Sequence, residues 1–113
     1  MPKEWILGMS DQNDIALLQS IISESPLLFP ILHDWEKLAL PDCWLVAGAI
    51  AQTVWNHSFG LPATHGIADI DIGYFDPADL SESAEAEHRS RIRAAFPHLP
   101  AWIDVKNEAR VHL

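Results

Sequence analysis

The stretch Ala68–Asp76, ADIDIGYFD, alternates acidic and apolar side chains over a run of residues that favour strands. Because successive side chains point to opposite faces of a strand, we expect Asp69 and Asp71 on one face and the isoleucines and tyrosine on the other. The apolar face can pack in a core, whereas the acidic face needs water or a positive partner. The pattern therefore predicts a strand over residues 67–75 with one buried face.

The two aspartates would lie about 7 Å apart along such a strand, where their charges repel each other. A divalent cation between them would make this arrangement favourable. Gly73 comes next on the same face, and its missing side chain leaves room for a ligand to approach the backbone. The alternative is a solvated edge strand whose exposed face is acidic, and a bare Asp-x-Asp motif is more typical of that alternative.

A third carboxylate shifts the balance toward a metal site. Residues 102–105 read as the next strand, and in it Asp104 stands between apolar neighbours, as Asp69 and Asp71 do. If the two strands are neighbours, the three acids form the oxygen-ligand set that Mg²⁺ or Mn²⁺ prefers. Such a set can hold two ions about 3.5 to 4 Å apart for an in-line phosphoryl displacement. The alternative for Asp104 is a turn or cap residue.

A junction between a strand and a helix is the second candidate element. Residues 43–47 (CWLVA) read as a short buried strand that runs through Gly48 into a helical segment ending near Gly60. Small residues at Gly48 and Ala49 would let phosphates approach backbone N–H groups at the positive end of this helix. Many such turns use glycine for conformational reasons alone, so the feature is weak by itself.

The remaining pattern completes an alternation of helices and strands. Residues 11–23 predict a first helix, Ser25-Pro26 begins a second that reaches about Trp35, and a helix after the acidic strand ends near Phe96. The order helix, helix, strand, helix, strand, helix, strand predicts an α/β (α+β) fold with helices packed on a small mixed sheet.

The length of 113 residues suits one domain, with an N-terminal helical accessory at 1–40 and a core at 41–113. The sequence stops at Leu113 without a turn or cap, so we also expect a core that is incomplete at its C-terminal end. No signal peptide or membrane span is evident, and we expect a cytoplasmic protein without membrane partners.

Composition narrows the class of function. The net charge of -9 argues against an extended nucleic-acid surface, because phosphate contacts need concentrated basic residues. It allows a nucleotide held through a metal. The basic residues at 89–93 read as a solvated helix face rather than an anion site. The five tryptophans are expected in the core, among them Trp55 on the helix after Gly48.

Three segments together carry a family resemblance: VAGAIAQTVWN (46–56), DIDIGYFD (69–76) and WIDVKNEARVH (102–112). They resemble the small, mostly bacterial nucleotidyltransferase-like family of unassigned substrate, within the DNA polymerase beta nucleotidyltransferase superfamily. The resemblance covers about two-thirds of the chain. It implies a metal-dependent transfer of a nucleoside monophosphate from an NTP to an unknown acceptor, with Mg²⁺ or Mn²⁺ as the cofactor.

The resemblance also implies roles for individual residues. Gly48 and Ala49 would lie near the triphosphate, and Asp69, Asp71 and Asp104 would be the metal-binding and catalytic carboxylates. The sequence departs from the superfamily's usual Gly-Gly or Gly-Ser by having Ala49, which removes a hydroxyl that often touches phosphate. Related sequences often have a basic residue at the position of Ala51.

Lys106 should share the face of Asp104, two residues earlier, and could neutralise triphosphate charge; the alternative is a surface lysine. Two other functions are open. One is a catalytically degenerate domain of the same fold that binds a nucleotide or a protein. The other, ranked last, is a glycosyltransferase, which also uses Asp-x-Asp but is typically about twice as long and would not require Asp104.

Overall fold

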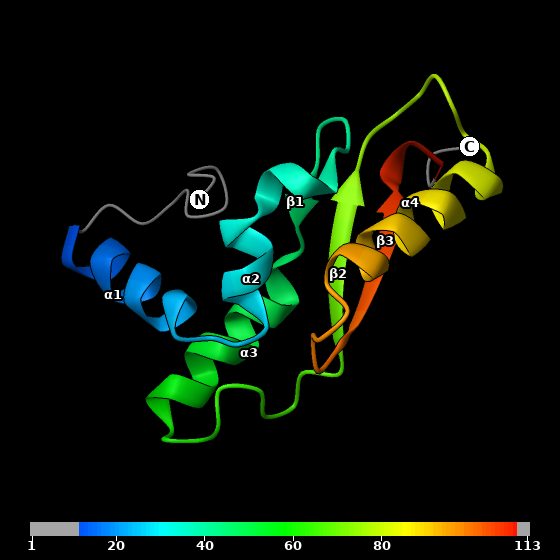
Figure 1. Ribbon diagram of the computed structural model, residues 1–113. Coiled ribbons are helices and arrows are strands. Elements are labelled where there is room, and N and C mark those ends of the chain that lie inside the picture. Colours follow the sequence, from blue (N-terminus) through cyan, green and yellow to red (C-terminus); the bar gives the residue numbers. More distant parts are fainter. Residues whose placement is uncertain (1–11, 111–113) are drawn as a thin grey trace.

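The computed structural model describes residues 12–110, and their helices and strands follow the predicted order (Figure 1). The elements are α1 (Gln12–Ser23), α2 (Leu28–His33), the 3₁₀ helix η2 (Trp35–Leu38), β1 (Trp44–Leu45), α3 (Ala47–Ser58), β2 (Asp69–Tyr74), α4 (Glu82–Ala95), β3 (Trp102–Asn107) and the 3₁₀ helix η3 (Glu108–Arg110). The mixed fold of helices and a small sheet is confirmed. Within these residues, no helix is long and apolar enough to cross a membrane.

Several element bounds differ from the prediction by one to three residues, among them those of β1 and α2. The strand expected over 43–47 is only two residues long, because α3 already begins at Ala47. The helix expected from Ser25-Pro26 begins at Leu28, after a turn in which the Ser25 hydroxyl accepts hydrogen bonds from the N–H groups of Leu27 and Leu28 (3.3 and 3.1 Å). The N-cap residue of α2 is Leu27, which has no side-chain cap, so Ser25 stabilises the turn before the helix and does not begin the helix itself.

The three strands form one sheet in the order β1-β2-β3. β1 pairs antiparallel with β2, and Trp44 lies opposite Gly73. β2 pairs in parallel with β3, and Asp71 lies opposite Asp104. The parallel pair requires a crossover, which α4 supplies. The condition that the two acid-bearing strands are neighbours is thus met.

The sheet has one buried face and one open face. Ile70, Ile72 and Tyr74 on β2 are at most 1% exposed, and Ile103 and Val105 continue this face on β3. They join one hydrophobic cluster with residues of α1, α2, α3 and α4. Figure 1 shows α1 to α3 on one side of β2, with α4 alongside β3. The helices thereby leave the alternate side chains of β2 and β3, including both aspartates of β2, toward solvent.

Three of the four described tryptophans depart from the prediction of a core role, whereas Trp35 is partly buried against the hydrophobic cluster. The side chains of Trp44, Trp55 and Trp102 are 40%, 58% and 65% exposed, and Trp5 lies outside the described residues. The prediction that Trp55 is buried is wrong, because the buried positions of α3 are Ala49, Thr53 and Asn56, on another side of the helix. Trp55 instead packs against Phe59, with ring centroids 4.7 Å apart and ring planes tilted by 34°.

The space expected above Gly73 is also taken. A Cβ at Gly73 would lie 2.6 Å from Cε2 of Trp44 and 2.7 Å from its Cζ2. Glycine is therefore required here by the close approach of the indole from the neighbouring strand, and the prediction of room for a ligand is wrong at this position. On β2, the space left for a ligand on the open face therefore lies at Asp69 and Asp71 and not at Gly73.

Candidate functional site

The acidic residues of β2 and β3 share the open face of the sheet. In a parallel pair, side chains at the same register point to the same side, so Asp69 lies beside Trp102 and Asp71 beside Asp104. Both β2 aspartates are exposed. Within residues 12–110 neither of their carboxylates has a hydrogen-bond or ion-pair partner. The alternative reading of Asp104 as a turn or cap residue is excluded, because it lies inside β3.

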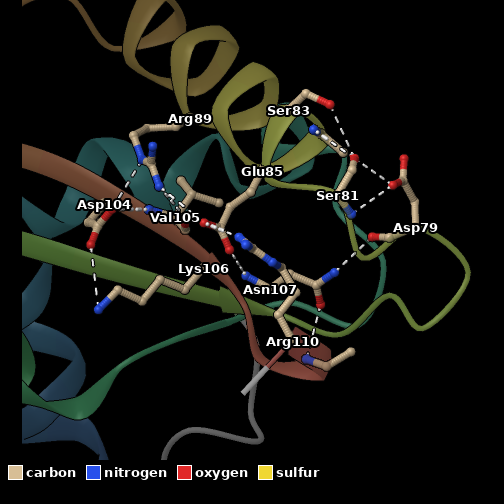
Figure 2. Close-up of polar contacts among 12 residues, drawn as sticks. Asp79, Ser81, Ser83, Glu85, Arg89, Asp104, Val105, Lys106, Asn107 and Arg110 are labelled. Carbon is tan, nitrogen blue, oxygen red and sulfur yellow. Dashed lines mark hydrogen bonds and ion pairs between the residues drawn. The ribbon is translucent and has the colours of Figure 1, made fainter. Parts of the chain in front are cut away.

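The two carboxylate oxygens of Asp104 have different surroundings (Figure 2). Oδ1 accepts hydrogen bonds from Nε of Arg89 (3.1 Å) and from the backbone N–H of Val105 (3.0 Å). Among the described residues, the polar neighbour of Oδ2 is Nζ of Lys106, at 3.8 Å, which is longer than a hydrogen bond. The predicted sharing of a face by Asp104 and Lys106 is confirmed. Arg89 thus fixes the carboxylate through one oxygen and leaves the other toward solvent.

A row of α4 side chains holds the free edge of β3. Glu85, Arg89 and Arg93 follow one another at a spacing of four residues. Each meets a backbone group of β3: the Asn107 N–H donates to Oε2 of Glu85 (2.8 Å), Nη2 of Arg89 donates to Val105 O (3.2 Å), and Nε of Arg93 donates to Ile103 O (2.7 Å). Four helical residues rise about 6 Å and two strand residues about 6.6 Å, so the two repeats match.

The reading of residues 89–93 as a solvated helix face is therefore wrong. All three arginines of this segment donate to backbone carbonyls, since Arg91 reaches Leu38 O in η2 at 2.7 Å. Their N–H groups donate to backbone carbonyls of β3 and η2, and the sequence alone does not show that these carbonyls lie within reach. The spacing Glu85, Arg89, Arg93 is the signal that could have indicated a common face.

The ion pairs of α4 connect the acidic face with η3 (Figure 2). Oε1 of Glu85 lies 3.4 Å from Arg89 and 3.0 Å from Arg110. Asn107, at the end of β3, is 1% exposed. Its amide nitrogen donates to the carbonyls of Asp76 and Asp79, so it clamps the loop that leads into α4. Asn107 and Arg110, which belong to the third of the family-like segments, thus have structural contacts in this arrangement.

The open face contains a hollow of about 590 Å³, here called the charged hollow. Three acids and three basic residues line it together with one tryptophan: Asp69, Asp71, Asp104, Arg89, Arg93, Lys106 and Trp102. Their formal charges cancel, which suits a ligand that brings both anionic groups and cations. The sequence pattern did not indicate Arg89, Arg93 or Trp102 as site residues.

Carboxylate oxygens are suitable ligands for Mg²⁺ or Mn²⁺, and three carboxylates line one hollow. In the arrangement described for residues 12–110, however, no three His, Cys, Asp or Glu side chains converge closely enough to coordinate a metal. Asp69 and Asp71 are exposed, so their side chains can change rotamer. The one neighbour of Asp104 Oδ2 among the ion pairs of the described residues is the exposed and flexible Lys106, which can move away from it. The donor set fits a divalent cation once these side chains turn inward.

The junction at Gly48 lies next to the acidic strand. The backbone N–H of Val46, the residue before α3, donates to Asp71 O at 2.9 Å. Gly48 is exposed, and a Cβ there would meet no atom from another part of the described chain within 4 Å, whereas Ala49 is buried. Neither residue is among those that line the charged hollow. Any ligand contact at these positions would therefore use their backbone N–H groups.

Comparison with known families assigns the chain. A family model described as Nucleotidyltransferase matches residues 33–113. The chain belongs to this nucleotidyltransferase family. The resemblance drawn from the three sequence segments is thereby confirmed at the level of the family.

The nucleotidyltransferase fold is also supported by a solved structure, described as "The NMR structure of the protein reveals a CCA-adding enzyme head domain". The similarity has a TM-score of 0.69 and 26% sequence identity, and it covers 93% of this chain and 52% of that one. This chain therefore spans about half the length of the solved structure. A comparison with curated proteins finds no significant match.

The segment matched by the nucleotidyltransferase model contains β1, α3, β2, α4 and β3. It therefore includes every residue that lines the charged hollow. α1 lies before the matched segment, although the similarity to the solved structure covers most of the chain.

Proposed function

We propose that this chain is the nucleotide-transferring part of a metal-dependent nucleotidyltransferase. In the proposed reaction an acceptor hydroxyl attacks the α-phosphorus of an NTP, a new P–O bond forms, and pyrophosphate leaves. The family match and the likeness to a CCA-adding enzyme head domain support nucleotidyl transfer as the reaction class. The observation that carries the proposal is Asp71 opposite Asp104, with Asp69 on the same face and in the same hollow.

Asp69, Asp71 and Asp104 would hold Mg²⁺ or Mn²⁺, which would neutralise phosphate charge and polarise the reacting phosphoryl group. One carboxylate of the three would also take the proton that the attacking hydroxyl loses. Arg89 and the Val105 N–H position Asp104 through Oδ1, which keeps Oδ2 toward the ligand. These contacts orient the acid without consuming both of its oxygens.

Basic and backbone groups would bind the phosphates. Lys106 is 62% exposed at its side chain and can leave Asp104 for a phosphate oxygen at little cost. The N–H groups of Gly48 and Ala49, in the first turn of α3, are free of intrahelical partners and suit an anion. Because Val46 is hydrogen-bonded to Asp71, this turn stays beside the acidic strand.

Metal-stimulated pyrophosphate release from mixed NTPs tests the proposal. We expect Asp71→Asn to lower the rate by about 10²-fold or more, since it removes one charge and one proton acceptor without changing shape. Asp14→Asn, an exposed aspartate of α1 outside the hollow, is the matched control and should leave the rate unchanged. Release that depends on Mg²⁺ and persists in Asp71→Asn would remove the aspartates from the mechanism.

A degenerate nucleotide-binding domain is the second candidate. It is favoured by Arg89 and Lys106, which already compensate the charge of Asp104. In this case calorimetry would detect binding of MgATP, and no pyrophosphate would be released from any NTP. The two candidates differ in turnover alone, so measuring both quantities on one preparation separates them.

A further inference from the structure

A second hollow adjoins the charged hollow. It has a volume of about 390 Å³ and is lined mostly by apolar groups, among them Ala68, Phe96, Leu99 and Pro100; we call it the apolar hollow. Arg93 and Trp102 line both hollows. The two hollows are therefore adjacent at this pair of side chains, one lined mainly by charged residues and the other mainly by apolar ones.

The shared pair forms a flat and fixed surface. Cζ of Arg93 lies 4.7 Å from the ring centroid of Trp102, and Nε of Arg93 is anchored to Ile103 O at 2.7 Å. The indole is nevertheless 65% exposed, the largest value among the exposed large hydrophobic residues of the described chain. A large aromatic side chain that is held in place and left open offers a stacking surface at small entropic cost.

We propose that the apolar hollow binds a nucleobase, stacked on the Trp102–Arg93 pair, with its phosphates directed to the charged hollow. The inference rests on the proposed function and adds a base subsite to it. A nucleotide has one planar, weakly polar end and one anionic end, and the two hollows match these ends in the same order. Indole rings and guanidinium planes both stack on bases.

The same lining predicts weak discrimination between bases. Apart from the Trp102 indole N–H and the Arg93 guanidinium, the side chains that line the apolar hollow carry no hydrogen-bonding group. Every base has a π-face, so stacking alone tolerates all four bases. We therefore expect the four NTPs to bind within about tenfold of one another, because no edge-specific hydrogen bonds reward one base.

Titrations with the intact chain test the base subsite without turnover. Adenosine, which has no phosphate, is added without metal while the indole N–H resonance of Trp102 is followed by NMR, with Trp102→Phe used for its assignment. MgATP and magnesium tripolyphosphate are compared by calorimetry. We expect adenosine to shift the Trp102 resonance. We expect Trp102→Ala to lower the affinity for MgATP by about tenfold and to leave the affinity for magnesium tripolyphosphate unchanged.

Variants separate stacking from folding. Trp102→Phe should retain most of the MgATP affinity, because a smaller ring still stacks. Trp55→Ala removes an equally exposed indole that lines neither hollow and should change nothing. If Trp102→Ala loses affinity for MgATP, the subsite holds the base of the incoming NTP. If it loses affinity for a short single-stranded oligonucleotide but not for MgATP, the subsite holds the base of the acceptor.

The inference is overturned if adenosine does not shift the Trp102 resonance and Trp102→Ala binds MgATP and the oligonucleotide with the affinities of the wild type. This outcome is distinct from failure of the proposed function. Failure of the latter is absence of metal-stimulated pyrophosphate release, which neither the adenosine titration nor the calorimetry requires.

Discussion

Replacing Asn107 by aspartate should destabilise the protein strongly and in a way that depends on pH. The Asn107 side chain is buried and makes four hydrogen bonds. Its Nδ2 donates to Asp76 O (3.0 Å) and Asp79 O (3.1 Å), and its Oδ1 accepts from the N–H groups of Asp76 (3.0 Å) and Ala109 (3.1 Å). Aspartate has the same shape but puts an oxygen against two carbonyls.

The magnitude follows from these contacts. Two lost donated bonds cost about 2 kcal/mol in the free energy of unfolding, and an unpaired buried carboxylate raises the total to about 4 kcal/mol near neutral pH. Burial beside carbonyls would raise the pKa of the new carboxyl above its unfolded value of about 3.9. The penalty should therefore be smallest below that pH, where the group is neutral in both states, and grow as pH rises.

Urea unfolding followed by tryptophan fluorescence, at about pH 7 and about pH 4, measures the difference between variant and wild type. Asn107→Ala is the control: it loses all four bonds and should show a penalty of about 4 kcal/mol with little dependence on pH. A variant N107D within about 0.5 kcal/mol of the wild type at neutral pH, or a penalty equal at both pH values, would refute the reasoning.

Two further predictions concern the sheet. Gly73→Ala should lower the free energy of unfolding by about 1 to 3 kcal/mol, because the new methyl group displaces the Trp44 indole. Adding Trp44→Ala should recover part of this loss in urea unfolding, and penalties that simply add would contradict the contact. Tyr74, the chain's one tyrosine, is buried with no partner for its hydroxyl among the described residues, and burial with nearby acids raises its pKa. The midpoint of its absorbance titration should therefore lie above a pH of about 10. The free energy of unfolding should fall as the pH rises past the unfolded pKa of about 10, because there the unfolded state ionises more readily than the folded one. A midpoint at or below this value would contradict the burial of Tyr74.

The alternation of side chains made the acidic strand predictable. In β2 the period of two separates apolar from acidic residues, and that period alone assigns Ile70 to the core and Asp71 to the open face. A strand, helix, strand order favours parallel contact of the two acid-bearing strands, whereas the register that sets Asp104 opposite Asp71 is a property of the folded sheet.

Long-range contacts explain what the sequence did not reveal. Hydrophobicity places tryptophans inside on average, but Trp102 alternates with buried neighbours on a strand whose other face is open. The closeness of Trp44 to Gly73 depends on the register of a two-residue strand, which no local pattern specifies. The roles of the α4 arginines depend on how the helix lies along β3, a tertiary property that propensity does not contain.

The side-chain row of α4 along β3 also has a consequence for association between molecules. A strand at the border of a sheet normally offers its free backbone groups as a template for a foreign strand. Here Glu85, Arg89 and Arg93 each bind one backbone group of β3, and the opposite border of the described sheet is a strand of only two residues. Cutting these side chains back should therefore promote fibrous or amorphous self-assembly, even where the folded monomer survives.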